Sequence, residues 1–165
     1  MLKSLKPNNP VFMDTTFLLP FFRVNIEVEG FSLDKFEGFL TKISKLHFSE
    51  LSIFEAKAKI FRLSRENKAY TPALEDFGKN LTVLRGDERF IFHPYTGQDD
   101  RFFNSISAKD LALDSFDMII LAQALNIGVL VTEDEGILRV RDREEFVKDP
   151  TLRTLKIKRW KELEI

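Results

Sequence analysis

The stretch DSFDMIILAQALNIGVLVT, residues 114–132, constrains the fold more than any other part of this sequence. Its acidic start, apolar body and glycine end are typical of a helix over 114–128. The apolar run 129–132 follows without a linker and is typical of a buried strand. A helix that leads directly into a buried strand favours a fold in which helices cover a sheet.

The rest of the chain alternates strands and helices in the same way. Strands are predicted at 11–14, 46–51, 89–93 and 154–160, an extended segment at 21–30, helices over 32–45, 52–68 and 72–85, a loop at 94–100, and a short acidic helix after residue 132. This alternation favours an α/β sandwich around a mainly parallel sheet. Because the sequence shows no convincing linker, we expect a single domain over residues 1–165.

Composition excludes several classes of protein. The absence of cysteine rules out disulfides and thiolate metal sites. No run is long enough to span a membrane, and the start MLKSLKPNNP lacks the apolar core of a signal peptide, so we expect a soluble, cytoplasmic protein. The net charge of −1 does not indicate a nucleic-acid binder. If bound metal neutralised four acids that together carry −4, however, the rest of the chain would carry +3.

Those four acids come from four separate stretches. Asp14 ends the first predicted strand, and Asp134 lies in the acidic run that follows the strand at 129–132. Asp117 lies in the first turn of the helix over 114–128, and Glu55 in the first turn of the helix after the second strand. Sites in α/β folds form at the carboxyl ends of parallel strands, so these side chains are candidates for one shared site.

Clustered carboxylates point to a divalent cation. They repel one another and raise each other's pKa values, and a hard cation removes that cost. Oxygen ligands alone select Mg²⁺ or Mn²⁺ over zinc. Two such ions roughly 3.5–4 Å apart activate water and stabilise a leaving oxygen in phosphodiester cleavage. The pattern therefore indicates metal-dependent hydrolysis.

Each acid also has a purely structural interpretation. Asp14 could cap a turn before Thr15 and Thr16, and Asp134 could cap the helix that follows it. The spacing of Asp114 and Asp117 fits a variant of the capping box, which we favour for Asp114. Glu55 could be a solvated helix residue. The joint placement of the acids, rather than any one of them, favours a site.

With these residues assembled, the chain resembles the PIN-domain nucleases, the family that includes VapC-type toxins and archaeal RNA-processing enzymes. The resemblance covers residues 11–137 and rests on four motifs: VFMDTT with Asp14, SIFEAKAKI with Glu55, DSFDMIILAQALNIG with Asp117, and VLVTEDEG with Thr132 and Asp134. The last block is the most specific. Glu50 lies near Glu55, and the sequence does not decide which of the two belongs to the site.

The resemblance implies a three-layer α/β/α fold, cleavage of single-stranded or structured RNA with Mg²⁺ or Mn²⁺, and frequent formation of homodimers. It implies Asp14, Asp117 and Asp134 as metal ligands, with Glu55 helping to hold metal or water. In this scheme Thr15 or Thr132 orients a carboxylate, and Glu135 gives further acidic support. The protein would be either a toxin with an antitoxin partner or an RNA-processing enzyme.

Other functions fit less well. A haloacid-dehalogenase-like phosphatase would need a second acid two residues after Asp14, where the sequence has Thr16, and a phospho-receiver domain would need paired early acids. The main alternative is a PIN-like module that binds RNA or protein without cutting. A structural α/β domain whose four acids are coincidental caps is a further, weaker alternative.

The remaining candidate residues favour ordinary structural roles. His47 and His93 lack the spacing of zinc ligands, and core packing is a better explanation for Phe102 and Phe103 than base stacking. Two basic groups could bind RNA but are typical of solvated surfaces: Lys57, Lys59, Arg62, Arg65 and Lys68, and Lys156, Lys158, Arg159 and Lys161.

Overall fold

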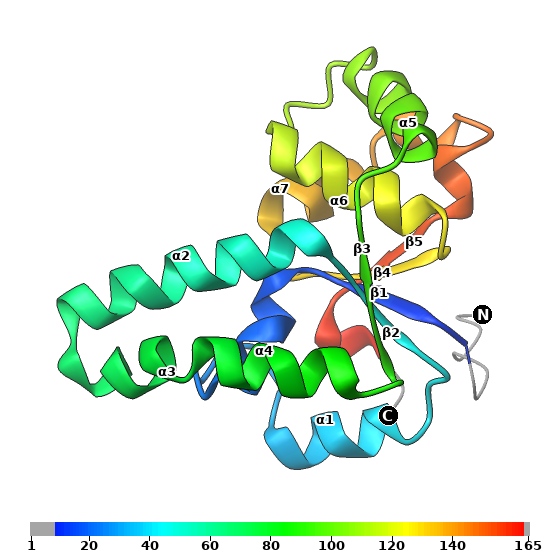
Figure 1. Ribbon diagram of the computed structural model, residues 1–165. Coiled ribbons are helices and arrows are strands. Elements are labelled where there is room, and N and C mark those ends of the chain that lie inside the picture. The colour runs from blue at the N-terminus through cyan, green and yellow to red at the C-terminus, as the bar shows by residue number, and fades with distance from the viewer. Residues whose placement is uncertain (1–8, 164–165) are drawn as a thin grey trace.

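A computed structural model describes residues 9–163 and places a five-stranded, wholly parallel sheet at the centre (Figure 1). The strand order is β3-β2-β1-β4-β5. The strands are β1 (Val11–Met13), β2 (Leu46–Ser49), β3 (Phe90–His93), β4 (Val129–Val131) and β5 (Lys156–Lys158). Residues 1–8, which belong to the stretch MLKSLKPNNP discussed above, lie outside the described residues.

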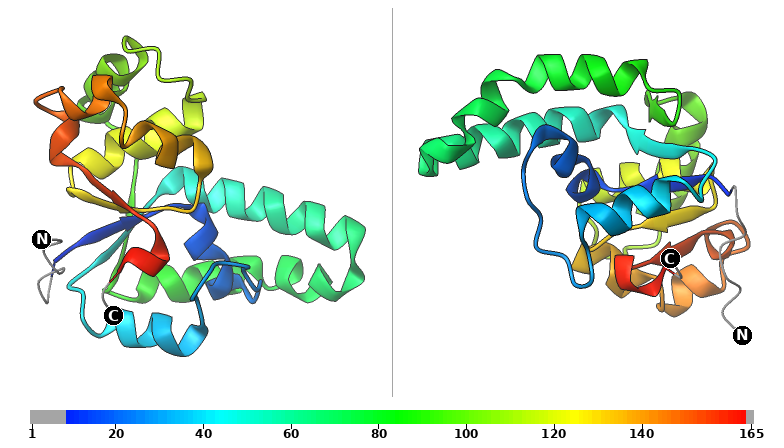
Figure 2. Two further views of the ribbon diagram at one scale, coloured as in Figure 1. Left: turned by 180° about the vertical axis from the view of Figure 1, so that it is seen from behind. Right: turned by 90° about the horizontal axis from the view of Figure 1, so that it is seen from below.

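Helices cover both faces of the sheet, which confirms the α/β/α sandwich (Figures 1 and 2). One layer holds η1 (Thr15–Phe22), α1 (Leu33–Leu40), α2 (Glu50–Glu66), η2 (Lys68–Tyr70), α3 (Thr71–Glu75), α4 (Phe77–Gly86) and η4 (Trp160–Glu162). The other holds α5 (Gly97–Ser107), α6 (Ser115–Leu125), α7 (Glu135–Val140), α8 (Glu144–Val147) and η3 (Leu152–Thr154). No helix among the described residues is long and apolar enough to cross a membrane.

The alternation of side chains along each strand builds two hydrophobic cores. Val11 and Met13 of β1 pack into the core under α1, α2 and α4, whereas Phe12 packs into the core under α5 and α6. Successive strand residues point to opposite faces, so a three-residue strand supplies both cores. Burial on both faces explains why the strands read as continuous apolar runs.

The segment at 21–30, predicted to be extended, forms no strand. Its first two residues end the 3-10 helix η1 (Thr15–Phe22), from which Phe17, Leu18 and Phe22 all reach the core. Arg23 ends η1 in the left-handed region, with φ of 63°, and donates its backbone N–H to the carbonyl oxygen of Pro20. Residues 23–32 connect η1 to α1 without a strand.

Several predicted boundaries also shift. The helix over 72–85 is divided at Asp76 into α3 and α4. The predicted loop at 94–100 already contains the start of α5 at Gly97, where Thr96 and Asp99 form a capping box. Strand β2 ends at Ser49, since the Ser49 hydroxyl accepts the Leu51 N–H and begins α2 two residues before the predicted start.

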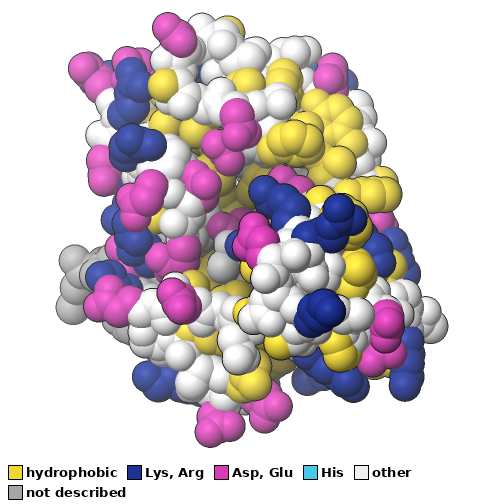
Figure 3. Space-filling view, turned by 90° about the vertical axis from the view of Figure 1, so that its left-hand side faces the viewer, with side chains coloured by type: hydrophobic (Ala, Val, Ile, Leu, Met, Phe, Trp, Pro, Cys, Tyr) yellow, Lys and Arg dark blue, Asp and Glu magenta, His cyan; other side chains and the backbone are white. Residues whose placement is uncertain are grey.

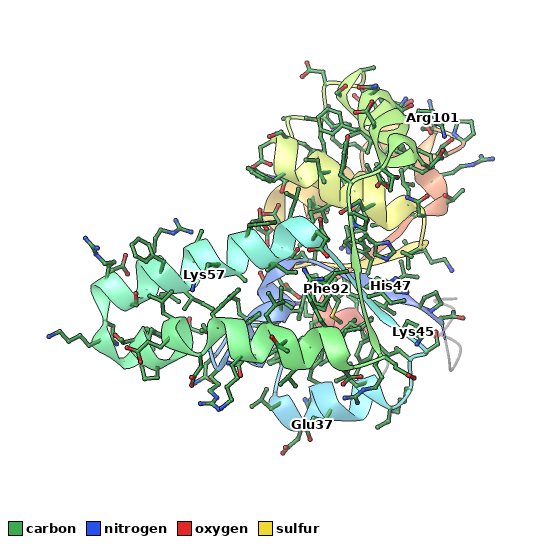
Figure 4. The ribbon with its side chains drawn as sticks, in the orientation of Figure 1. Glu37, Lys45, His47, Lys57, Phe92 and Arg101 are labelled. Atoms are coloured by element: carbon green, nitrogen blue, oxygen red, sulfur yellow. The ribbon has the colours of Figure 1, made fainter. Side chains whose placement is uncertain are left out.

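Helices α2, α3 and α4 extend together beyond the sheet (Figures 1 and 2). Lys57, on the side of α2 that faces α3 and α4, donates to the carbonyl oxygen of Leu74 at 3.3 Å and lies 4.8 Å from the ring centroid of Phe77 (Figure 4). Phe77 in turn stacks on Phe22 with ring centroids 4.1 Å apart. These contacts hold one side of α2, and its other side borders the cleft described below.

Trp160, near the C-terminal end of the described residues, packs into the core that contains Val11 and Met13. It is 1% exposed, packs against the rings of Phe17, Phe31 and Phe39, and donates its indole N–H to the carbonyl oxygen of Gly30 at 3.1 Å. The connection 23–32 is thereby fixed to the body of the protein. Large buried aromatic residues of this kind contribute most of the packing energy of small domains.

We therefore expect Trp160→Ala to lower the free energy of unfolding by about 3–5 kcal/mol, through lost burial and the cavity that remains. The measurement is urea unfolding followed by circular dichroism. Leu33→Ala serves as the control, because Leu33 is 55% exposed and its truncation should change stability little. Equal effects of the two substitutions would contradict the role of Trp160.

Candidate active site

Asp14 lies at the carboxyl end of β1 and is 8% exposed. Its Oδ1 accepts the Thr16 N–H at 3.0 Å and so caps η1. Its Oδ2 accepts the hydroxyl of Thr132 and lies 3.3 Å from the backbone nitrogen of Glu133, which donates to it. The cap predicted for Asp14 is thus confirmed, and the same carboxylate also connects β1 to the residues that follow β4.

Burial raises the pKa of Asp14 from its ordinary value of 3.8 to about 6. The hydrogen bonds from Thr132, Thr16 and Glu133 lower the pKa, but desolvation is the larger effect, and the charge of nearby Asp134 raises it further. The ionised carboxylate is therefore held at a cost that a bound cation would relieve.

Thr132 connects the carboxylates of Asp14 and Asp134. It is fully buried, its hydroxyl donates to Asp14, and its Oγ1 accepts the Asp134 N–H at 3.0 Å. Asp134 in turn caps α7 by accepting the Ile137 N–H on Oδ1 at 2.9 Å. The positions of both acids are therefore fixed by one threonine.

Asp117 meets Asp134 over Gly136. A Cβ added to Gly136 would lie 3.0 Å from Oδ1 of Asp134 and 3.5 Å from Oδ2 of Asp117, so both carboxylates border the same small space. Partial burial raises the pKa of Asp117 to about 6, and the charges of Asp134, Asp114 and Glu55 raise it further. Asp114 caps α6 by accepting the Asp117 N–H at 2.8 Å, as expected.

Glu55, rather than Glu50, faces these acids. The carboxylate of Glu55 accepts the hydroxyl of Thr15, and Oγ of the buried Ser52 lies 2.9 Å from Oγ1 of Thr15. Glu50 instead forms a bidentate ion pair with Arg85 at 2.8 Å and does not line the cleft. The sequence left this choice open, and a contact 40 residues apart in the chain decides it.

Arg159 engages the acids next to Asp134. Its guanidinium donates to Glu133 at 3.1 Å and to Glu135 at 2.6 Å. Glu133 also accepts the Trp160 N–H at 2.8 Å. Glu135, which the resemblance suggests as a supporting acid, therefore borders the site with its charge balanced by an arginine.

These residues surround one cleft of about 830 Å³ between α2 and α6, at the carboxyl ends of β1 and β4. Figure 3 shows a hollow in this face of the molecule, with acidic, basic and hydrophobic side chains around it. The lining residues are Asp14, Thr15, Thr16, Leu19, Leu51, Phe54, Glu55, Ala58, Lys59, Arg62, Phe116, Asp117, Ile120, Glu133, Asp134, Glu135 and Ile137. The four predicted catalytic acids and Thr15 are all among them.

The donor set fits a hard divalent cation in its chemistry. Asp14, Glu55, Asp117 and Asp134 offer only oxygen ligands, which suit Mg²⁺ or Mn²⁺. Within residues 9–163 no three histidine or acidic side chains are arranged around one point as a ready ligand set. Mg²⁺ keeps several water ligands and is bound through only one or two carboxylates, so pairs of these acids satisfy its needs.

Several lining residues were not assigned to this site from the sequence, among them two aromatic residues and two cations. Phe54 and Phe116 were not singled out, and Lys59 and Arg62 were interpreted as solvated cations. The signal was present in α2, because residues 51, 54, 55, 58, 59 and 62 repeat at helical spacing and include Glu55.

The two histidines lie outside the cleft. His47 of β2 (Figure 4) forms a hydrogen bond with His93 of β3 between ring nitrogens 2.6 Å apart. His93 also packs on Phe12. Burial lowers the pKa of His47 to about 4, and burial also lowers the pKa of His93. Phe102 and Phe103 pack against the second core, as expected.

Comparisons with known proteins agree with this fold. No family model and no curated protein matches the chain. PAE2754 from Pyrobaculum aerophilum, an archaeal PIN-domain protein, aligns with a TM-score of 0.54 and 17% identity over 79% of this chain and 84% of its own. VapBC2 from Rickettsia felis is a toxin-antitoxin complex solved with a DNA fragment from their promoter. One of its chains aligns with a TM-score of 0.56 and 15% identity over 92% of this chain and 98% of its own. The chain therefore has a VapC-like PIN-domain fold.

The raised pKa of Asp14 predicts a pH-dependent effect of Asp14→Asn on stability without divalent metal. As pH rises from about 4 to above 6, the unfolded chain ionises Asp14 before the folded chain does, so the wild type loses stability. Asparagine does not titrate, so the stability of the variant relative to wild type should increase over this range by on the order of 2–3 kcal/mol.

The measurement is urea unfolding in EDTA at several pH values. Asp34→Asn is the control, since Asp34 is an exposed acid of α1. If the difference in free energy of unfolding between wild type and Asp14→Asn stays constant from pH 4 to 7, burial does not raise the pKa of Asp14.

Proposed function

We propose that this protein is a divalent-metal-dependent endoribonuclease that hydrolyses RNA phosphodiester bonds. One observation carries the proposal: the carboxylates of Asp14, Glu55, Asp117 and Asp134 line a single cleft at the carboxyl edge of a parallel sheet. They come from β1, α2, α6 and the start of α7, elements far apart in sequence. A structural domain does not need to gather four acids in this way. Burial, with repulsion from Asp134, raises the pKa values of both Asp14 and Asp117.

Asp14, Asp117 and Asp134 would hold Mg²⁺ or Mn²⁺, with Glu55 helping to hold metal or water. When bound, the cation supplies an activated water and stabilises the charge of the leaving oxygen. The chain itself fixes the ligands in place: Thr132 orients Asp14 and Asp134, and Thr15 orients Glu55. Gly136 leaves room between Asp117 and Asp134 that a larger residue would fill.

The fold neighbours support one biological setting. VapBC2 is a toxin-antitoxin complex, which supports a role for this protein as a toxin with an antitoxin partner. A role as an RNA-processing enzyme fits the same site chemistry. We also propose that the protein forms a homodimer, as the family resemblance implies.

A non-catalytic module that binds RNA or protein is the second candidate. It is favoured by the lack, within residues 9–163, of three acidic or histidine side chains already arranged around one point. The two candidates differ in whether the bound strand is cut.

The direct test is cleavage of a mixed single-stranded RNA pool with Mg²⁺ or Mn²⁺. We expect wild type to cut the RNA, and Asp14→Asn and Asp117→Asn each to reduce the rate by at least about 100-fold, the lower end of what positioned charged groups contribute. Asp34→Asn should leave the rate unchanged. Binding of RNA by wild type without any cutting would favour the non-catalytic module, and cutting that survives both site substitutions would remove the support for this site.

The pKa values of Asp14 and Asp117 also predict the pH dependence of cleavage. Both carboxylates must lose their protons to hold a cation, and both have pKa values of about 6, so the rate should rise between pH 5 and pH 7. At subsaturating metal we expect at least about a tenfold fall per pH unit below 6. Higher Mn²⁺ should move the midpoint to lower pH, and a profile that is flat from pH 5 to 7 would exclude these ligands.

A further inference from the structure

The cleft has chemically different ends along α2. The face of α2 that lines it carries Leu51, Phe54, Glu55, Ala58, Lys59 and Arg62. With a rise of 1.5 Å per residue, Lys59 and Arg62 lie roughly 6 and 10 Å further along the helix axis than Glu55. One wall of the cleft therefore runs from the acidic centre to two cations.

Neither cation is used by the fold. Lys59 and Arg62 form no ion pair and no side-chain hydrogen bond with any of residues 9–163. Lys57, by contrast, is engaged with Leu74 and Phe77 on the opposite side of the helix. Two unpaired cations beside an acidic centre suit a strand with a repeating negative charge, because they can take the phosphates next to the one at the acids.

Two aromatic rings also border the cleft. Phe54 of α2 is 68% exposed and Phe116 of α6 is 50% exposed. One exposed aromatic residue needs no explanation, but two from separate elements at one cleft provide surfaces on which bases can stack. A base within a duplex is already stacked and paired, so only an unpaired base can use these rings.

We infer that Phe54 and Phe116 stack unpaired bases of the RNA while Lys59 and Arg62 bind the phosphates beside the one held at the acids. This inference rests on the proposed function and assigns positioning residues to it. A basic peptide fits less well, because it would be repelled by Lys59 and Arg62. The cleft thereby selects single strands by stacking and guides their path along α2 by charge.

The test is equilibrium binding of a short fluorescent RNA in Ca²⁺, compared with the same RNA in a duplex. Phe54→Ala and Phe116→Ala should each weaken binding of the single strand by about tenfold, within the range measured for stacking of one base on one aromatic side chain. The duplex should bind more weakly and respond to neither substitution. Scanning the strand with abasic positions should find one position at which each penalty disappears.

The paired variant Lys59→Gln with Arg62→Gln should weaken binding and reduce the slope of log affinity against log salt by about 0.7 for each lost phosphate contact. Two matched controls come from the same helix. Phe61→Ala removes an aromatic residue that is 48% exposed but does not line the cleft, and Lys57→Gln removes a cation that faces α3 and α4. Thermal unfolding of every variant checks that the fold is intact.

The inference is overturned if Phe54→Ala and Phe116→Ala bind RNA like Phe61→Ala, or if single strand and duplex respond alike. It is also overturned if wild type binds neither RNA but binds an arginine-containing apolar peptide, which would assign the cleft to a protein partner. Cleavage with Mn²⁺, measured in parallel, separates the two proposals. Base-dependent binding without cleavage would contradict only the proposed nuclease activity. Cleavage that is unaffected by both phenylalanine substitutions would contradict only the stacking role.

Discussion

The hydrogen bond from Thr132 to Asp14 is the interaction on which the site depends. It connects the ends of β1 and β4, which are neighbours in the middle of the sheet. Hydrogen bonds to charged groups contribute roughly 1.5–3 kcal/mol, and Asp14 accepts three of them. Desolvation nevertheless exceeds their effect and raises the pKa of Asp14, so the fold keeps this carboxylate buried at a net cost.

The two-sided sheet explains how the other acids reach Asp14. Each face has its own core, and α2 and α6 belong to opposite layers. Their N-terminal turns both lie at the carboxyl edge of the sheet, so Glu55 and Asp117 approach Asp14 from opposite sides. Their mutual repulsion is visible in the raised pKa of Asp117, to which Asp134, Asp114 and Glu55 contribute. Packing in the two cores, rather than any attraction among the acids, therefore holds the site together.

Much of this arrangement could be predicted from local sequence. The helix and strand over 114–132, the parallel sheet and the four acids follow from apolar runs and capping signals, which act over a few residues. The segment 21–30 forms no strand, because Val24, Ile26 and Val28 pack against the core from an irregular connection, and that packing depends on residues distant in sequence. The choice of Glu55 over Glu50 depends on Arg85 and Thr15, and the cleft position of Phe54, Phe116, Lys59 and Arg62 depends on how α2 lies against α6. Contacts between residues this far apart leave no local pattern.

The capping and site interpretations of the acids are compatible, because a carboxylate has two oxygens. Asp134 uses Oδ1 to cap α7, and no described residue donates a hydrogen bond to its Oδ2. Asp114, rather than Asp117, caps α6 by accepting the Asp117 N–H, and a backbone hydrogen bond from Asp114 lowers the pKa of Asp117 in return. Asp14 uses both oxygens: Oδ2 accepts two hydrogen bonds and Oδ1 accepts one, so a lone pair remains on Oδ1. The caps thus fix where Asp14 and Asp134 lie and leave oxygen atoms available. A cation in this cleft would find Oδ2 of Asp134 less engaged than Oδ1, because Oδ1, which lies over Gly136, already caps α7.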